Sequence, residues 1–74
     1  MKAVLGVDTG GTYTDAALVD HETGDVLAGA KALTTRHDLS IGIRRAIQAV
    51  LARRAASPED VDLVALSTTL ATNA

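Results

Sequence analysis

The sequence of 74 residues predicts an α/β fold, in which an antiparallel three-strand meander is followed by a helix and a parallel fourth strand. Two observations predict this order. In the first half of the chain, three apolar runs of strand length are separated by short turns that are polar or contain glycine. The apolar period then changes to three and four residues over one long segment, and another apolar run follows it. Because a helix joins the last two runs, the final strand can lie parallel to the first.

The three apolar runs predict strands over residues 2–8, 14–20 and 26–33. The first run is apolar on both of its alternating faces, which is typical of a strand buried on both sides. Paired glycines within residues 9–12 indicate a tight turn between the first and second strands. The polar stretch at residues 21–24 ends in glycine and indicates a hairpin loop between the second and third strands.

A helix is predicted over residues 38–55, where apolar side chains recur on one face. That face comprises Leu39, Ile43, Ala46, Ile47, Val50 and Leu51. Asp38 is a suitable N-cap, and Arg53 and Arg54 fall in the last turn, where cations complement the helix dipole. Gly42 costs up to about 1 kcal/mol relative to alanine in a helix interior, so we expect a loose first turn.

The remainder of the chain predicts three short segments. Residues 57–60 indicate a capped turn, with serine as N-cap and proline in the first position. Residues 61–67 predict the fourth strand, which we place beside the first. Residues 68–74 lack the alternation of a strand and predict the start of a helix at the carboxyl end of the fourth strand.

The composition excludes several classes of protein. The net charge of −2 provides no positive surplus for a nucleic-acid backbone, and the arginines between residues 44 and 54 are interpreted as a solvated helix face. The chain has no cysteine and therefore no disulfide or thiolate metal site. No stretch approaches the roughly 18 apolar residues of a membrane span, and Asp8 interrupts the N-terminal run too early for a signal peptide. We expect a cytoplasmic protein that binds neither nucleic acid nor membranes.

The turn after the first strand carries the residues that suggest chemistry. Glycine has no Cβ, so the backbone can approach a phosphate closely with its N–H groups, and threonine hydroxyls add further donors. The predicted phosphate-binding residues are Thr9, Gly10, Gly11 and Thr12. Asp8 would hold Mg²⁺ through water, because this ion dehydrates reluctantly. Asp15 would order a metal-bound or attacking water.

An alternative interpretation of this turn stays open. The same residues can form an ordinary β-turn, in which threonine and aspartate satisfy local backbone groups. A minimal hairpin needs only two polar residues, however, and does not explain why two carboxylates enclose this turn. The sequence contains neither the lysine-bearing P-loop pattern nor the glycine pattern of a dinucleotide fold. His21 and His37 lie in predicted loops and are expected to be exposed rather than catalytic.

Two strings resemble a known family. Asp8-Thr9-Gly10-Gly11-Thr12-Tyr13-Thr14-Asp15 resembles the first phosphate motif of the superfamily of actin, heat-shock chaperones and sugar kinases. More narrowly, it is similar to Asp-x-Gly-Gly-Thr-Phe-Thr-Asp, which opens proteins of the ATP-dependent hydantoinase/oxoprolinase family. Thr68-Thr69-Leu70-Ala71-Thr72-Asn73-Ala74 resembles that family's Thr-Thr-x-Ala-Thr-Asn-Ala. Tyr13 replaces the family's phenylalanine, and Leu66-Ser67 stands where many members have His-Gly, which puts the substrate in question.

The resemblance implies that residues 1–74 are the N-terminal portion of an incomplete domain, part of an actin-like (ribonuclease H-like) ATPase lobe. It implies ATP and Mg²⁺ as cofactors, with Asp8 as metal ligand and with Asp8 and Asp15 as catalytic residues. Thr68, Thr69 and Asn73 would lie near the substrate, or would cap the N-terminus of a helix.

The activity implied by the resemblance is ATP-dependent hydrolysis of a cyclic amide such as 5-oxoproline or a hydantoin. ATP would activate the amide carbonyl, and water would open the ring with release of ADP and phosphate. The resemblance also implies a second hydantoinase-type subunit and an oligomer. Residues 1–74 alone are expected to be inactive, because this fold binds nucleotide between two lobes. The alternatives are a small-molecule kinase of the same superfamily, acting on a sugar or an acid, and a non-catalytic module.

Overall fold

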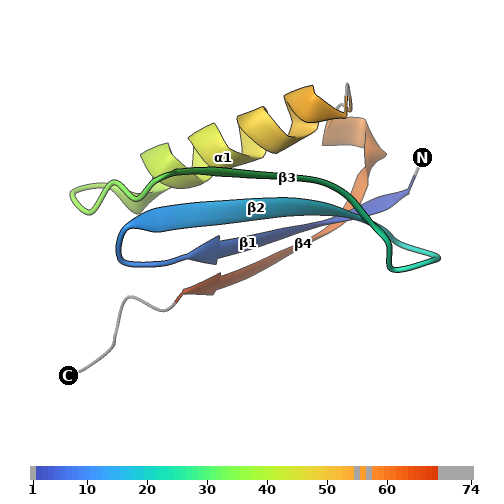
Figure 1. Ribbon diagram of the computed structural model, residues 1–74, viewed down its shortest axis with the longest axis horizontal. Coiled ribbons are helices and arrows are strands. Elements are labelled where there is room, and N and C mark those ends of the chain that lie inside the picture. The colour runs from blue at the N-terminus through green and yellow to red at the C-terminus, as the bar shows by residue number, and fades with distance from the viewer. Residues whose placement is uncertain (1, 55, 57, 69–74) are drawn as a thin grey trace.

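The computed structural model describes residues 2–54, 56 and 58–68. In this part of the chain, four strands form one sheet and one long helix lies over a face of it (Figure 1). The elements are β1 (Ala3–Thr9), β2 (Tyr13–Asp20), β3 (Val26–Leu33), α1 (Leu39–Arg53), a 3-10 helix (Pro58–Asp60) and β4 (Val61–Thr68). The predicted bounds of the strands and of the helix are confirmed to within two residues.

The order of the strands, β3-β2-β1-β4, follows from their connections. The pairs β1–β2 and β2–β3 are antiparallel because their turns are short, whereas β1 and β4 are parallel because α1 lies between β3 and β4 in the chain. The predicted α/β fold class, with its meander and parallel fourth strand, is confirmed. The β1–β2 turn, the β3–α1 loop and the carboxyl end of β4 lie at the same end of the molecule (Figure 1).

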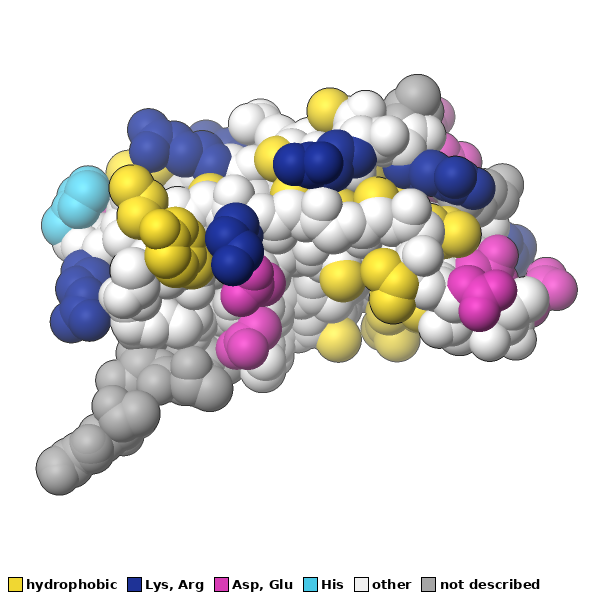
Figure 2. Space-filling view, in the orientation of Figure 1, with side chains coloured by type: hydrophobic (Ala, Val, Ile, Leu, Met, Phe, Trp, Pro, Cys, Tyr) yellow, Lys and Arg dark blue, Asp and Glu magenta, His cyan; other side chains and the backbone are white. Residues whose placement is uncertain are grey.

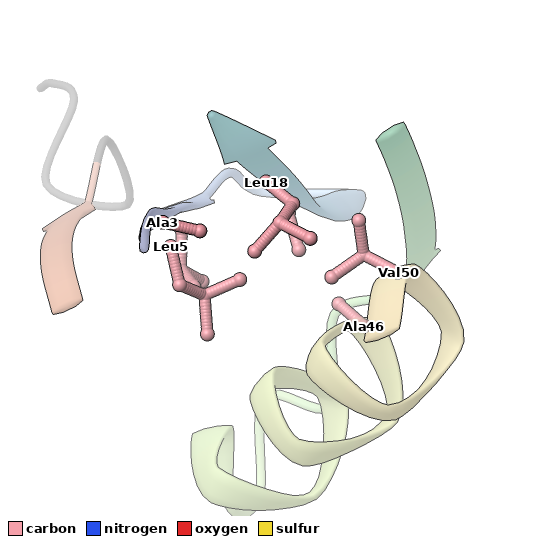
Figure 3. Close-up of a cluster of buried hydrophobic side chains, with 7 residues drawn as sticks. Ala3, Leu5, Leu18, Ala46 and Val50 are labelled. Carbon is pink, nitrogen blue, oxygen red and sulfur yellow. The ribbon is translucent and has the colours of Figure 1, made fainter. Parts of the chain in front are cut away.

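The hydrophobic core lies between α1 and the sheet. Successive side chains of a strand point to opposite faces, so every second residue of β1 and β2 faces the helix. Figure 3 shows Leu5 and Leu18 gathered between the strands and the helical residues Ala46 and Val50. The buried hydrophobic residues are Ala3, Leu5, Val7, Ala16, Leu18, Ala46 and Val50. The apolar residues that alternate along the strands and those that recur on one face of α1 therefore pack into one cluster.

The face of the sheet that points away from α1, called the open face below, is covered by no described element. On β1 it carries Val4, Gly6 and Asp8, of which the first two are half-buried and the third is exposed. The sequence predicted burial of the first strand on both sides, and the structure differs. Among the described residues only the face toward α1 is buried, because α1 is the only element that packs on the sheet.

Helix α1 begins where the sequence predicts. The carboxylate of Asp38 accepts hydrogen bonds from the hydroxyl and the N–H of Ser40, at 2.6 and 3.1 Å. These bonds, the hydroxyl first, hold the pKa of Asp38 below its usual range. Gly42 is buried against β3, where a Cβ would lie 2.8 Å from the carbonyl oxygen of Leu33. The sequence led us to expect a loose first turn, but the glycine permits close packing there.

The β2–β3 connection is the predicted hairpin loop, with Gly24 in the left-handed region at φ 79°. His21 and His37 are both exposed, as expected. Nδ1 of His21 lies 2.9 Å from Oδ2 of Asp62, which connects this loop to β4. The helix start predicted at residues 68–74 falls outside the described residues from position 69 onward.

Candidate functional site

The turn between β1 and β2 is held by the segment that follows β3. The hydroxyl of Thr34 donates to the carbonyl oxygen of Gly10 at 2.8 Å, and its N–H donates to the carbonyl oxygen of Thr12 at 2.9 Å. The guanidinium of Arg36 donates to the carbonyl oxygen of Gly11 from Nη2 and Nε, at 3.1 and 3.3 Å. We call Thr34 and Arg36 the turn clamp. Three successive carbonyl groups of the turn are therefore directed toward one segment.

The turn clamp also sets the direction of the amide N–H groups. In a trans peptide the C=O and N–H groups point in opposite directions, and no cis peptide bond occurs in the described residues. Because the carbonyl of Gly10 faces Thr34, the N–H of Gly11 faces away from the clamp. In the same way, the N–H of Thr12 faces away from Arg36. Neither N–H has a hydrogen-bond partner among the described residues. Successive N–H groups of a turn that have no other partner can bind an anion.

Four side chains form a row across the open face, one from each strand. In the order of the strands they are Lys31, Asp15, Asp8 and Ser67. Asp8 and Asp15 are direct partners in the antiparallel ladder, where like charges repel. Oγ of Ser67 donates to Oδ1 of Asp8 at 3.3 Å, and Nζ of Lys31 lies 3.9 Å from Oδ1 of Asp15. The fold thus brings together the two carboxylates that the sequence predicted to be catalytic.

This row of side chains borders a hollow of about 760 Å³ in the open face. The adjacent row of the sheet contains only small residues, and Gly29, Ala17, Gly6 and Ala65 are partners in register. Figure 2 shows acidic side chains gathered beside a basic one near the middle of the view. Because small side chains leave the backbone accessible, a ligand can lie against the sheet beside two carboxylates.

Thr9 and Gly10 make contacts that Gly11 and Thr12 do not make. Thr9 is only 1% exposed and faces α1, because adjacent residues of a strand point to opposite faces and Asp8 points to the open one. Its Oγ1 has no partner among the described residues. The N–H of Gly10 is engaged, since it donates to the carbonyl oxygen of Tyr13 at 2.9 Å. The donors that remain available at the turn are those of Gly11 and Thr12.

Of the residues predicted near a substrate, Thr68 is the last residue of β4. The backbone of Thr68 pairs with Thr9, which places it at the same end of the sheet as the β1–β2 turn. Thr69 and Asn73 lie outside the described residues.

Sequence reasoning missed Lys31, Thr34 and Arg36 as members of this region. All three come from β3 or from the loop after it, and the pairing of β2 with β3 brings Lys31 to Asp15 and the other two to the turn. The register of that pair shifts between Leu18 and Val19, so partners cannot be found by counting outward from the hairpin loop. Lys31 was therefore not recognisable as the partner of Asp15.

The donor set on the open face fits a divalent cation. Mg²⁺ prefers oxygen ligands, retains several waters and is usually held by one or two carboxylates together with substrate phosphates. Asp8 and Asp15 are exposed and face each other, so a cation near them would relieve their repulsion. No three side chains of metal-binding type gather within residues 2–54, 56 and 58–68.

Comparison with known proteins gives one family and one curated relative. The family model described as the hydantoinase/oxoprolinase N-terminal region matches residues 4–74. Caprolactamase subunit alpha of Pseudomonas jessenii is 36% identical over 74 residues, and the match covers 95% of this chain and 10% of that protein. The chain therefore spans about a tenth of the length of this curated relative.

Component A of the (R)-2-hydroxyglutaryl-CoA dehydratase of Acidaminococcus fermentans has a similar fold. Its crystal structure matches with a TM-score of 0.77 and 20% sequence identity, over 93% of this chain and 26% of that one. At this identity the likeness concerns the fold alone, and it agrees with the predicted actin-like fold. In the described part of this chain, no helix has both the length and the apolar character needed to cross a bilayer.

Proposed function

This chain belongs to the hydantoinase/oxoprolinase N-terminal region family, and we propose that the full-length protein is an ATP-dependent hydrolase of a cyclic amide. The name of the caprolactamase relative supports this substrate class, because caprolactam is a lactam. Hydantoins and 5-oxoproline contain the same kind of ring bond. We therefore propose the class of substrate, a cyclic amide, rather than one compound.

One observation carries the ATP-binding part of this proposal. The turn clamp holds the carbonyl oxygens of Gly10 and Gly11, so the N–H groups of Gly11 and Thr12 face away from it without partners among the described residues. Preorganised N–H donors bind phosphate without first giving up bonds of their own. An ordinary hairpin turn has no need of a clamp from the segment that follows a third strand.

Each residue of the site has a role in the proposal. Gly11 and Thr12 donate to phosphate oxygens, the latter also through its exposed hydroxyl. Asp8 is the ligand for Mg²⁺, and Ser67 orients its carboxylate. Mg²⁺, when bound, offsets the negative charge of the phosphates. Asp15 accepts a hydrogen bond from water and orients it. Near the substrate, we propose Thr68, Thr69 and Asn73.

The proposed reaction overcomes the low reactivity of the ring carbonyl. Amide resonance makes that carbon a weak electrophile. Transfer of the terminal phosphate to the carbonyl oxygen, with release of ADP, turns this oxygen into a good leaving group. Water then adds at the carbon, and the ring C–N bond breaks as the nitrogen takes up a proton, which leaves an acyl phosphate. A second water hydrolyses this acyl phosphate to the acid and phosphate. ATP, the cyclic amide and two waters give ADP, phosphate and a ring-opened acid.

Binding of Mg·ATP to the full-length protein tests this proposal. We expect Asp8→Ala to weaken the affinity for Mg·ATP by about tenfold or more, because a metal-bridging carboxylate is lost while the turn is retained. Isothermal titration calorimetry measures the affinity. Asp25→Ala is the matched control, since Asp25 is an exposed acid in the β2–β3 loop. Equal affinity of wild type and Asp8→Ala for Mg·ATP would favour the non-catalytic module.

The dependence of ADP release on the second substrate separates a hydrolase from a kinase of the same superfamily. We expect a lactam such as caprolactam or 5-oxoproline to stimulate release of ADP and free phosphate by the full-length protein. Stimulation by a sugar, with the phosphate retained on the product, would favour the kinase.

The relative's name also bears on assembly. It is called subunit alpha, which indicates that it works with a subunit of another kind. We propose the same for the full-length form of this chain, as an oligomer that contains a second hydantoinase-type subunit.

A further inference from the structure

The row on the open face contains a cation that the proposed function does not use. Lys31 lines the same hollow as Asp8 and Asp15 and comes from β3, two strands away from Asp8. Its Nζ lies 3.9 Å from Oδ1 of Asp15 and 5.1 Å from the centroid of the Tyr13 ring. The ammonium group is therefore held over the hollow by one carboxylate and one aromatic face.

These two contacts orient the ammonium group of Lys31 but leave its hydrogen-bond donors available. Its side chain is 63% exposed, and 3.9 Å is well beyond the roughly 2.8 Å of a charge-assisted hydrogen bond. A lysine ammonium has three donors, and a loose surface pair adds little to stability. Lys31 can therefore bind another anion with little loss.

The distance across the sheet suits a phosphate chain. Neighbouring strands lie roughly 4.8 Å apart, so the backbones at Lys31 and Asp8 are about 10 Å from each other. A phosphate chain and the length of a lysine side chain together bridge that gap. The small residues of the adjacent row leave the space between them open.

We infer that Lys31 binds the terminal phosphate of the nucleotide, an inference that rests on the proposed function. Asp15 is the carboxylate proposed to orient water at the transferred phosphate, and Lys31 is its neighbour in the row. The terminal phosphate is therefore the one within reach. When the ammonium group moves onto a phosphate oxygen, the carboxylate of Asp15 becomes free to accept a hydrogen bond from water.

The test compares a non-hydrolysable ATP analogue with ADP, each titrated with Mg²⁺ into the full-length protein. Lys31→Ala is expected to weaken binding of the analogue about tenfold and binding of ADP less than about twofold. Lys31→Arg, which keeps the charge, is expected to retain most of the affinity for the analogue. A purely structural role would change both affinities alike, so equal losses for the analogue and ADP would overturn the inference.

Two further variants distinguish a direct contact from a general effect of charge. Arg53 also lines the hollow, and Arg53→Ala is expected to change the affinity for the analogue less than about twofold. A loss equal to that of Lys31→Ala would show that only the net charge matters. If Asp15→Asn restored the analogue affinity of Lys31→Ala, Lys31 would act only by offsetting Asp15. Either result would overturn the inference.

Failure of this inference can be told from failure of the proposed function. If the wild type binds the analogue and Lys31→Ala binds it equally well, only the inference about Lys31 falls. If the wild type binds neither the analogue nor ADP, the proposed function falls and the inference falls with it.

Discussion

Thr34 lies between the candidate site and the core, and its hydroxyl has a hydrogen-bond partner in each. Its Oγ1 donates to the carbonyl oxygen of Gly10 at 2.8 Å and lies 3.0 Å from Oγ1 of Thr14, which is buried. A buried polar group left without a partner costs more than the hydrogen bond itself contributed. The same hydroxyl therefore supports the fold and sets the direction of the N–H of Gly11.

Thr34→Val keeps the shape of the side chain and removes only the hydroxyl. We expect the free energy of unfolding to fall by about 1–3 kcal/mol, because the hydroxyl of Thr14 and the carbonyl of Gly10 lose a partner. We also expect weaker binding of Mg·ATP. Thermal unfolding and calorimetry of the full-length protein measure the two effects. Thr23→Val, in the exposed β2–β3 loop, is the control. Equal stability of these two variants would contradict this account of Thr34.

The position of the Arg36 side chain depends on Gly11 having no side chain. A Cβ at this position would lie 3.2 Å from Nη2 of Arg36, which is closer than most Cβ contacts. The glycine therefore leaves room for the guanidinium that donates to its own carbonyl oxygen. The paired glycines of the turn were predicted to let a phosphate approach. At Gly11 the structure gives a second reason for a glycine, because a side chain there would crowd Arg36.

Helix α1 is joined to β3 by a close backbone contact near its N-terminus. The N–H of Gly42 donates to Oγ1 of Thr35 at 2.8 Å, and the carbonyl oxygen of Leu33 lies 2.8 Å from the position that a Cβ would take. Because Thr34 and Arg36 belong to the same connection, this contact also positions the turn clamp. The packing of the first turn of α1 thus affects the candidate site through the loop residues 34–36.

Gly42→Ala tests this packing. An alanine is favoured over glycine in a helix by up to about 1 kcal/mol, but a Cβ at 2.8 Å from a backbone oxygen forces a shift that costs about 1–3 kcal/mol. We expect a net loss of stability, measured as a lower midpoint of thermal unfolding. Gly29→Ala is the matched control, because a Cβ there would lie at an ordinary 3.9 Å from the nearest atom. A higher midpoint for Gly42→Ala would show that the contact relaxes freely.

Strand β4 has little cover in the described part of the chain. Leu63, Val64 and Leu66 are 55%, 56% and 62% exposed. Leu63 points to the open face, whereas Val64 and Leu66 point to the side of α1. They remain exposed because α1 packs mainly over β2 and β3. An apolar groove of about 270 Å³ remains between the helix and β4. Contiguous apolar surface of this kind is typical of a contact within a larger protein.

The whole-molecule expectation concerns catalysis by residues 1–74 in isolation. We expect no ATP turnover by this segment, because the family resemblance implies that nucleotide lies between two lobes and only part of one is contained here. Release of phosphate from ATP, measured for the purified segment and for the full-length protein, tests this. Turnover by the segment alone would show that the architecture has been misjudged.

Periodicity in the sequence was enough to predict most of the fold. Alternation predicted the strands, the spacing of apolar residues predicted α1, and Asp38 predicted where that helix begins. These features depend on neighbours a few residues apart, so they can be seen in the chain itself. The glycine turn enclosed by Asp8 and Asp15 was likewise recognisable, and antiparallel pairing across a short turn brought the two carboxylates together.

Only the tertiary structure decided what surrounds those carboxylates. Lys31 faces Asp15 because of a register shift in the β2–β3 pair, and Thr34 and Arg36 reach the turn from a loop more than twenty residues away. It also placed the hydroxyl of Thr9 on the side of α1. The physical reason is that strand pairing and side-chain direction depend on how distant segments pack, which local sequence patterns do not encode. The sequence by itself thus determined which elements form and which turn carries the acids, and the pairing of β3 with β2 and of β4 with β1 decided the partners of those acids.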